Sequence, residues 1–179
     1  GFARHQAWHS NPPTITPHKA QMLADLLANP SNKQFYPFDY HISTCYEFSD
    51  DGLGITFQVE ASSENLEPMP FTLGMHFTFD FASWWGEDWL QGTVKNLGRF
   101  AWGTDSKAQA TDRFELPSGS VGLLDPAFHS AIIPARLREP VHLVSPDGDR
   151  TLEMSFEEAS ANADDLLWVS FLDPHNRFF

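Results

Sequence analysis

The chain has 179 residues, enough for one domain with a sizeable core. Its 41% hydrophobic content with sixteen Phe excludes the class of intrinsically disordered chains. Eleven Lys and Arg against 24 Asp and Glu give a formal net charge of −13, which argues against a nucleic-acid partner or an anionic membrane surface. Cys45 is the only cysteine, so the chain cannot form an intrachain disulfide or a zinc site with two of its own cysteines. No apolar run is long enough for a membrane span. We therefore expect one soluble, cytoplasmic domain over residues 1–179, with no membrane partner.

The first predicted element is a short helix from His18 to Ala28, because apolar residues recur there at helical spacing before Asn29-Pro30 ends the pattern. From Phe38 to Phe48, apolar side chains alternate with mostly polar ones, which is the period of a β-strand. An Asp-Gly turn at Asp51-Gly52 and a second alternating run from Leu53 to Ala61 follow. These features predict a β-hairpin.

The segment from Phe71 to Phe81 has apolar residues at every odd-numbered position. Its even-numbered residues, among them Thr72, His76 and Asp80, form a polar row. We expect a strand whose odd row faces the core and whose even row faces the other way.

Another hairpin is predicted near the end of the chain, where Val141–Val144 and Leu152–Phe156 flank the turn residues 145–150. A last short apolar strand is expected from Leu166 to Leu172. Short strands separated by turns, without long intervening helices, are typical of an antiparallel sandwich. The predicted fold class is therefore all-β, an antiparallel β-sandwich with one short helix.

Four Trp residues, Trp84, Trp85, Trp89 and Trp102, fall in the irregular stretch from 81 to 102. An indole plane suits the apolar C–H face of a pyranose, so these residues could stack on a sugar. The alternative interpretation, which we favour from the sequence alone, is that they cover a sheet face or an oligomer contact.

His76 is the most informative ionisable residue, because strand geometry places it opposite the apolar row of its segment. An imidazole in a binding cleft exchanges protons near neutral pH. A hydrogen-bonded surface histidine would give the same pattern. The residues alone favour this second interpretation.

The other histidines show neither HxH nor HExxH spacing, and the chain lacks a G-x-S-x-G elbow, a G-x-G-x-x-G turn and a phosphate loop. We therefore expect no metal and no cofactor. Cys45 has no obvious activating neighbour in the sequence and is interpreted as an inert thiol.

Several segments resemble the aldose 1-epimerase (galactose mutarotase-like) superfamily. The resemblance is carried by Tyr36–Tyr40, by Ser49–Leu53 and above all by Glu67–Phe77, which is similar to the family's strand P-F-x-x-G-x-H-x-x-F. Gly1-Phe2-Ala3-Arg4 with Trp8 resembles a segment of the hexose-6-phosphate epimerase branch. The late part of the chain, from Thr111-Asp112-Arg113 to Trp168, follows the same branch.

The resemblance implies a β-sandwich enzyme that interconverts the α and β anomers of an aldose or hexose 6-phosphate. In this family a Glu removes the proton from the anomeric hydroxyl and a His protonates the ring oxygen. His76 matches the acid. Arg4 and Asp112 match substrate-binding positions, although Arg4 could equally make an ordinary surface ion pair.

The family's basic Glu is expected after Phe179 and a further His before Gly1, so we expect the chain to be part of a longer polypeptide. A shortened relative without the base, acting as a non-catalytic carbohydrate-binding or structural module, is the alternative. The expected partner is a small-molecule sugar, and a homo-oligomer is possible because a truncated sandwich leaves sheet edges unpaired. Arg4 is the only basic residue in a matched motif, and the net charge is negative. We therefore expect a neutral aldose in preference to a sugar phosphate.

Overall fold

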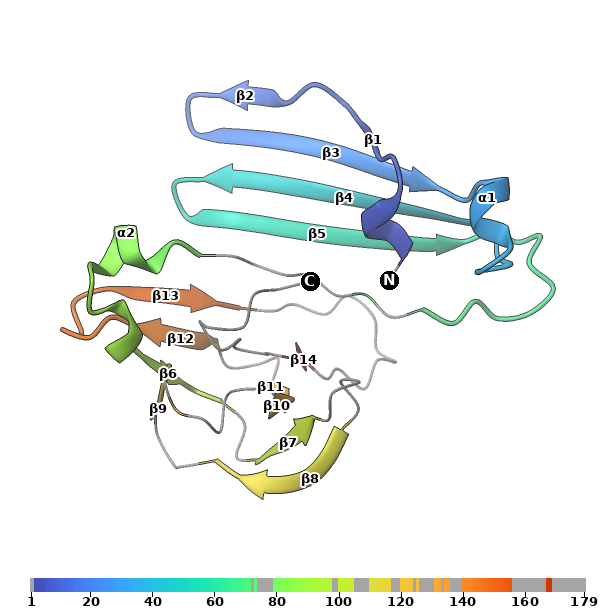
Figure 1. Cartoon of the computed structure of the whole chain (residues 1–179). Helices are drawn as coiled ribbons and strands as arrows, with labels where there is room; N and C mark the ends of the chain where they lie inside the picture. Colours follow the sequence, from blue (N-terminus) through green and yellow to red (C-terminus); the bar gives the residue numbers. More distant parts are fainter. Residues whose placement is uncertain are drawn as a thin grey trace. The chain divides into compact units, whose positions relative to one another are not determined.

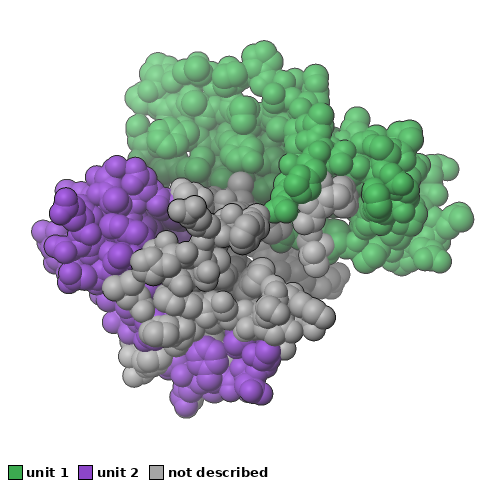
Figure 2. All heavy atoms as spheres, viewed as in Figure 1, with its two compact units in different colours: residues 1–75 green, residues 76–179 purple. Residues whose placement is uncertain are grey.

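The fold is described from a computed structural model (Figure 1). The residues that the structure describes are 2–71, 73, 79–97, 100–104, 110–116, 120–123, 125, 131–132, 134–135, 140–155 and 167–168. The chain divides into two compact units, Gly1–Met75 and His76–Phe179, which Figure 2 distinguishes by colour. Each unit is described by itself below.

The N-terminal unit is built around one antiparallel sheet with the strand order β1-β3-β4-β5, and β2 pairs with β3 beside β1 (Figure 1). Its elements are η1 (Phe2–His5), β1 (His9–Ser10), β2 (Thr14–Thr16), β3 (Lys19–Leu27), α1 (Pro30–Lys33), β4 (Tyr40–Ser49) and β5 (Gly52–Ala61). The long strands β3, β4 and β5 form two consecutive hairpins. The hairpin predicted at the Asp51-Gly52 turn is confirmed, and Gly52 there adopts a φ of +130° that a side chain would disfavour.

The prediction of a helix from His18 to Ala28 is wrong, because Lys19–Leu27 forms β3. Every residue of β3 has a partner in β4, from Lys19 opposite Ser49 to Leu27 opposite His41. This ladder satisfies the backbone of the segment, and it outweighs a local apolar spacing that also suits a helix. The short helix that does form here is α1, which begins at Pro30 after its cap Asn29.

The two faces of this sheet differ in character. The register puts Leu26 opposite Ile42 and Ile42 opposite Val59, so these residues share an apolar face. Leu26 is buried on this face, as are Ala24, Tyr40 and Thr44. The opposite face carries the polar residues of the same strands, which are described with the candidate site.

The C-terminal unit contains short strands in three antiparallel sheets, with orders β13-β12-β6-β9, β10-β7-β8 and β11-β14. Its elements are α2 (Phe81–Trp85), η2 (Trp89–Gln91), β6 (Thr93–Lys95), β7 (Phe100–Thr104), β8 (Ala110–Glu115), β9 (Ser120–Gly122), β10 (Ala131–Ile132), β11 (Pro134–Ala135), β12 (Val141–Val144), β13 (Thr151–Met154) and β14 (Leu167–Trp168). The late hairpin is confirmed, since β12 and β13 pair from Val141 opposite Met154 to Val144 opposite Thr151.

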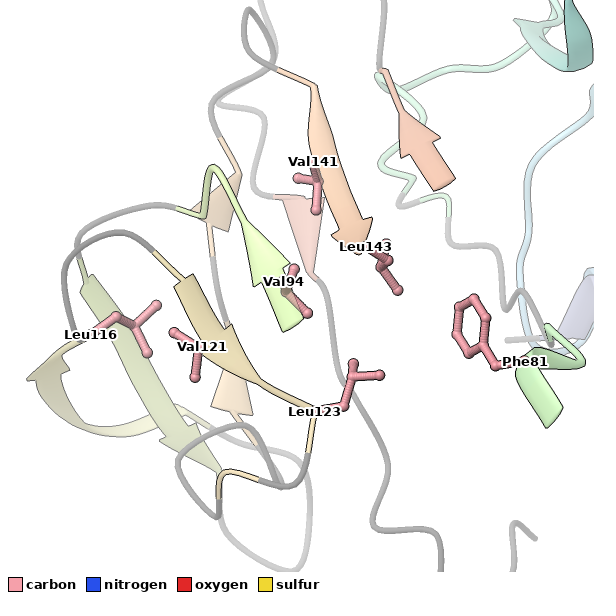
Figure 3. Close-up of a cluster of buried hydrophobic side chains, with 7 residues drawn as sticks. All are labelled: Phe81, Val94, Leu116, Val121, Leu123, Val141 and Leu143. Atoms are coloured by element: carbon pink, nitrogen blue, oxygen red, sulfur yellow. The ribbon is translucent and has the colours of Figure 1, made fainter. Parts of the chain in front are cut away.

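Buried apolar side chains from β6, β9 and β12, from the residues that follow β8 and β9, and from α2 form the core of this unit. Figure 3 shows the seven residues of the cluster, which are Phe81, Val94, Leu116, Val121, Leu123, Val141 and Leu143. Val94 and Val141 are fully buried, so the removal of their apolar side chains from water stabilises the unit.

The strand predicted from Phe71 to Phe81 does not form at its described ends. Phe71 and Leu73 are irregular in structure and 57% and 48% exposed, so these two members of the odd row do not face a core. Phe81 is buried, but it begins α2 because the Asp80 carboxylate caps that helix by accepting a hydrogen bond from the Ser83 amide. Residues 72 and 74–78, the middle of the predicted strand, lie outside the described residues.

Two of the four tryptophans help to close the core. Trp85 and Trp89 are partly buried and pack against the cluster, so their role as cover, which the sequence favoured, is confirmed. Trp85 lies in α2 and Trp89 in η2, where the sequence had indicated only irregular structure. Trp84, also in α2, stays 45% exposed.

All described strand pairs are antiparallel, and the described helices are short. The predicted all-β class with antiparallel sheets, in keeping with a β-sandwich of the aldose epimerase fold, is therefore confirmed. The described part of the chain contains no helix that is both long and apolar enough to cross a membrane.

Candidate functional site

Three residues were predicted to act on a sugar: His76, Arg4 and Asp112. His76 lies outside the described residues, so its orientation stays a prediction. Arg4 belongs to the N-terminal unit and Asp112 to the C-terminal unit. Each is therefore considered in its own surroundings.

Arg4 lies in the 3-10 helix η1 and is exposed. Its Nε donates a hydrogen bond to His5 Nε2 at 2.9 Å, and the Trp8 indole donates to the Ala3 carbonyl at 3.0 Å, which ties the turn to the following residues. No carboxylate among the described residues lies within ion-pair distance of the Arg4 guanidinium. The guanidinium thus keeps donors with which to bind an oxygen-rich ligand.

Asp112 lies in β8, with an exposed side chain. Its neighbour Arg113 stacks over the Phe100 ring, with the guanidinium carbon 3.6 Å from the ring centroid. Arg113 is thus held by an aromatic face on β7, which fixes the strand that presents Asp112.

Tyr36 and Asp39, which belong to the family-like segment Tyr36–Tyr40, anchor the loop that leads into the His76 segment. The Tyr36 hydroxyl donates a hydrogen bond to the Pro70 carbonyl at 2.5 Å, and burial, followed by the neighbouring Tyr40, raises the pKa of Tyr36. Asn65 receives a hydrogen bond from the Asp39 amide and donates one to the Asp39 carbonyl, both at 2.8 Å. The loop before Phe71 is therefore fixed at two points to residues 36–39.

A group of charged and imidazole side chains that the sequence did not reveal lies on the polar face of the N-terminal sheet. His41 Nε2 is 2.7 Å from the Asp25 carboxylate, and its Nδ1 is 3.7 Å from Glu60. His9 stands opposite Asp25 in the β1–β3 pairing. The half-exposed imidazole therefore has a carboxylate within 4 Å of each of its two ring nitrogens.

The register of two hairpins creates this group. Glu60 is directly opposite His41 in the β4–β5 pairing, and Asp25 is one diagonal step away across β3. The sequence pattern predicts a helix over residues 18–28, and a helix there does not place Asp25 in the sheet beside His41. The signal for a strand was the alternating apolar row formed by Met22, Ala24 and Leu26.

Metal binding finds no support in the described part of the chain, where no three His, Cys, Asp or Glu side chains are arranged to hold an ion. Cys45 is half-buried, and its Sγ accepts a hydrogen bond from the side-chain amide Nε2 of Gln21 at 3.2 Å.

Comparison with known proteins gives one result. The model of a family described as aldose 1-epimerase matches residues 1–121, a span that includes Arg4, His76 and Asp112. No curated protein and no solved structure matches the chain. Because the family model covers more than half of the chain, which also has the all-β fold, this protein belongs to the aldose 1-epimerase family.

Proposed function

We propose that the protein interconverts the α and β anomers of an aldose, with His76 as the general acid. The observation that supports this most strongly is the family match over residues 1–121, which contains the His76 motif together with Arg4 and Asp112. The anchoring of Pro70 by Tyr36 adds support, because it fixes the first residue of the P-F-x-x-G-x-H motif.

The reaction needs two opposed proton transfers. A base takes the proton of the anomeric hydroxyl, the C1–O1 bond becomes a carbonyl, and the C1–O5 bond breaks as His76 protonates the ring oxygen. Rotation about C1–C2 exposes the other carbonyl face, and the reverse steps close the ring as the opposite anomer. The resemblance implies that the base is a Glu. The sugar is neither oxidised nor reduced in these steps.

Arg4 and Asp112 are proposed to bind the substrate. The Arg4 guanidinium can donate to two adjacent hydroxyls, and the Asp112 carboxylate can accept from a hydroxyl. A neutral aldose is the proposed substrate class, because a dianionic phosphate usually requires more than one cation and the chain carries a net charge of −13.

Exchange NMR on the full-length protein tests the role of His76. With glucose or galactose in solution, magnetisation should pass between the α and β anomeric signals faster than in buffer. His76→Ala should lower that catalysed rate by about 10² to 10⁴ because the general acid is lost. The matched control is His18→Ala, since His18 is exposed in the β2–β3 turn and 3.6 Å from Asp50. If His76→Ala exchanges anomers at the wild-type rate, His76 is not the acid.

Calorimetric titration with glucose, galactose and glucose 6-phosphate tests the substrate class. We expect binding of the neutral sugars to be insensitive to salt and weakened by Arg4→Ala. Tighter binding of glucose 6-phosphate, decreasing as salt rises, would contradict the preference for a neutral aldose.

A further inference from the structure

One cavity of the C-terminal unit is lined by described residues that the proposed function does not use. Helix α2, Arg150 and the start of β13 line an open cavity of about 380 Å³, within the range of ligand pockets in proteins. The lining residues are Ser83, Trp84, Trp85, Arg150, Thr151 and Leu152. Neither Arg4 nor Asp112 lines it.

The indoles that line the cavity are held by an aromatic cluster. The Trp85 ring stacks on Phe81, with centroids 4.2 Å apart and planes inclined by 23°. Trp84 meets Phe81 edge-on at 6.1 Å and also contacts Phe79 at 6.1 Å, yet its side chain remains 45% exposed. Trp84 therefore offers an aromatic surface to a ligand at little cost in side-chain entropy, because its neighbours already restrain it.

The polar side of the cavity comes from the β12–β13 turn. The Arg150 amide donates to Ser145 Oγ at 3.0 Å, and the Arg150 carbonyl accepts from the Ser145 amide at 2.9 Å, so the backbone that carries the guanidinium is fixed. No described carboxylate lies within ion-pair distance of this guanidinium. Arg150 and the adjacent exposed Thr151 thus supply a hydrogen-bonding fork and a hydroxyl beside the indoles.

Two carboxylates next to the lining residues decide which ligands suit the cavity. Ser83 donates to Asp80 through its hydroxyl at 2.6 Å, and this bond lowers the pKa of Asp80. The Ser145 hydroxyl similarly lowers the pKa of Asp147, with a smaller effect from Arg150. Both aspartates are ionised at neutral pH, so they disfavour a phosphate, a nucleotide or another polyanion at this cavity.

We propose that this cavity is a saccharide-binding site for a neutral pyranose, formed by residues other than Arg4 and Asp112. The apolar C–H face of the sugar stacks on Trp84, and vicinal hydroxyls accept hydrogen bonds from the Arg150 guanidinium. Thr151 contributes a further hydroxyl at the rim. The proposal does not depend on catalysis by His76.

Titration of the full-length protein with methyl β-glucopyranoside tests this site, with Trp fluorescence and calorimetry as readouts. The methyl glycoside has no free anomeric hydroxyl, so it cannot undergo mutarotation and binding is measured without turnover. We expect saturable binding that Trp84→Ala and Arg150→Ala each weaken about tenfold. Trp84→Phe should restore part of the affinity, because a phenyl ring still stacks.

Phe35→Ala is the matched control for loss of an exposed aromatic ring, since Phe35 is 78% exposed and lies in the N-terminal unit. It should leave the affinity unchanged, and circular dichroism should show all variants folded. Binding that is insensitive to both Trp84→Ala and Arg150→Ala would overturn the proposal, as would no saturation up to about 100 mM glycoside. His76→Ala is expected to lose anomer exchange but keep this Trp84-dependent binding, so failure of either proposal is seen separately.

Discussion

Gly92, between η2 and β6, occupies a position with no room for a side chain. A Cβ there would lie 2.9 Å from the Trp85 ring and 2.9 Å from the Val144 carbonyl oxygen. Because the Val144 atom belongs to the backbone of a buried strand, it cannot move aside cheaply. Gly92→Ala is therefore expected to lower the free energy of unfolding by about 1 to 3 kcal/mol, as measured by urea denaturation.

Gly122 provides the matched control, since a Cβ at that position in β9 meets nothing within 4 Å. Gly122→Ala should leave stability unchanged or raise it by up to about 1 kcal/mol, because alanine loses less backbone entropy on folding. Equal stability of the two variants would show that Trp85 does not pack over Gly92 as described.

Asp80 makes the stability of the C-terminal unit dependent on pH. Hydrogen bonds from the Ser83 hydroxyl and amide lower its pKa from the ordinary value of 3.8. A carboxyl whose pKa is lower in the folded state stabilises the fold above its unfolded pKa, and this contribution is lost as pH falls through the folded value. Asp80→Asn keeps a good helix cap but cannot titrate, so its unfolding free energy should fall less steeply with acid.

Urea denaturation between about pH 5 and about pH 2 measures this difference. Asp51→Asn is the control, because the Asp51 carboxylate accepts no hydrogen bond from a described residue. If Asp80→Asn and the wild type lose stability in parallel, the bonds from Ser83 do not act on the ionised carboxylate.

At the level of elements, the loop from Ser62 to Pro70 depends on Asn65. Asn65→Ala removes both 2.8 Å hydrogen bonds to the backbone of Asp39, and we expect it to cost about 2 kcal/mol. Asn65→Asp keeps the acceptor for the Asp39 amide and loses only the donor, so its cost should be about half as large. Urea unfolding measures both, and an Asn65→Ala variant within about 0.5 kcal/mol of wild type would contradict this account of the loop.

How far the elements could be predicted depended on whether local and long-range signals agreed. The β4–β5 and β12–β13 hairpins were predictable because alternating strands flank a turn with Gly or Pro in place. β3 was not, because Met22, Leu23, Leu26 and Leu27 fit a helical spacing as well as they fit a strand, and only pairing with β4 decides between them. Phe81 begins a helix where alternation predicts a strand, because Asp80 caps that helix through Ser83. An alternating pattern cannot reveal such a cap.

For the candidate site, the sequence could supply only the motif residues, and the roles of these residues stay predictions. His76, Arg4 and Asp112 could be selected because each sits in a segment that resembles the family, and residues 1–121 do match the family model. The pairing of His41 with Asp25 and the cavity beside Trp84 depend on residues far apart in the chain. Such groupings follow from strand register and packing, which composition and spacing do not determine.

On the scale of the whole molecule, the negative charge supports the proposal of a small, uncharged ligand. A net charge of −13 repels polyanions at long range, and screening over about 8 Å at physiological salt leaves local groups to decide binding. Arg4 and Arg150, the two arginines proposed to bind a sugar, lie in separate units, so each candidate site has one guanidinium group among its proposed ligand-binding residues. Because a dianionic phosphate usually recruits more than one cation, we propose that each of these guanidinium groups binds the hydroxyls of a neutral sugar.

Polarimetry of freshly dissolved α-glucose and α-galactose tests the central claim, aldose 1-epimerase activity, most directly. With the full-length protein present, the optical rotation should relax to its usual equilibrium value at a rate proportional to protein concentration, because a catalyst speeds both directions equally. Relaxation at the rate of buffer alone, for both neutral sugars and for glucose 6-phosphate, would contradict the assignment of epimerase activity to this protein.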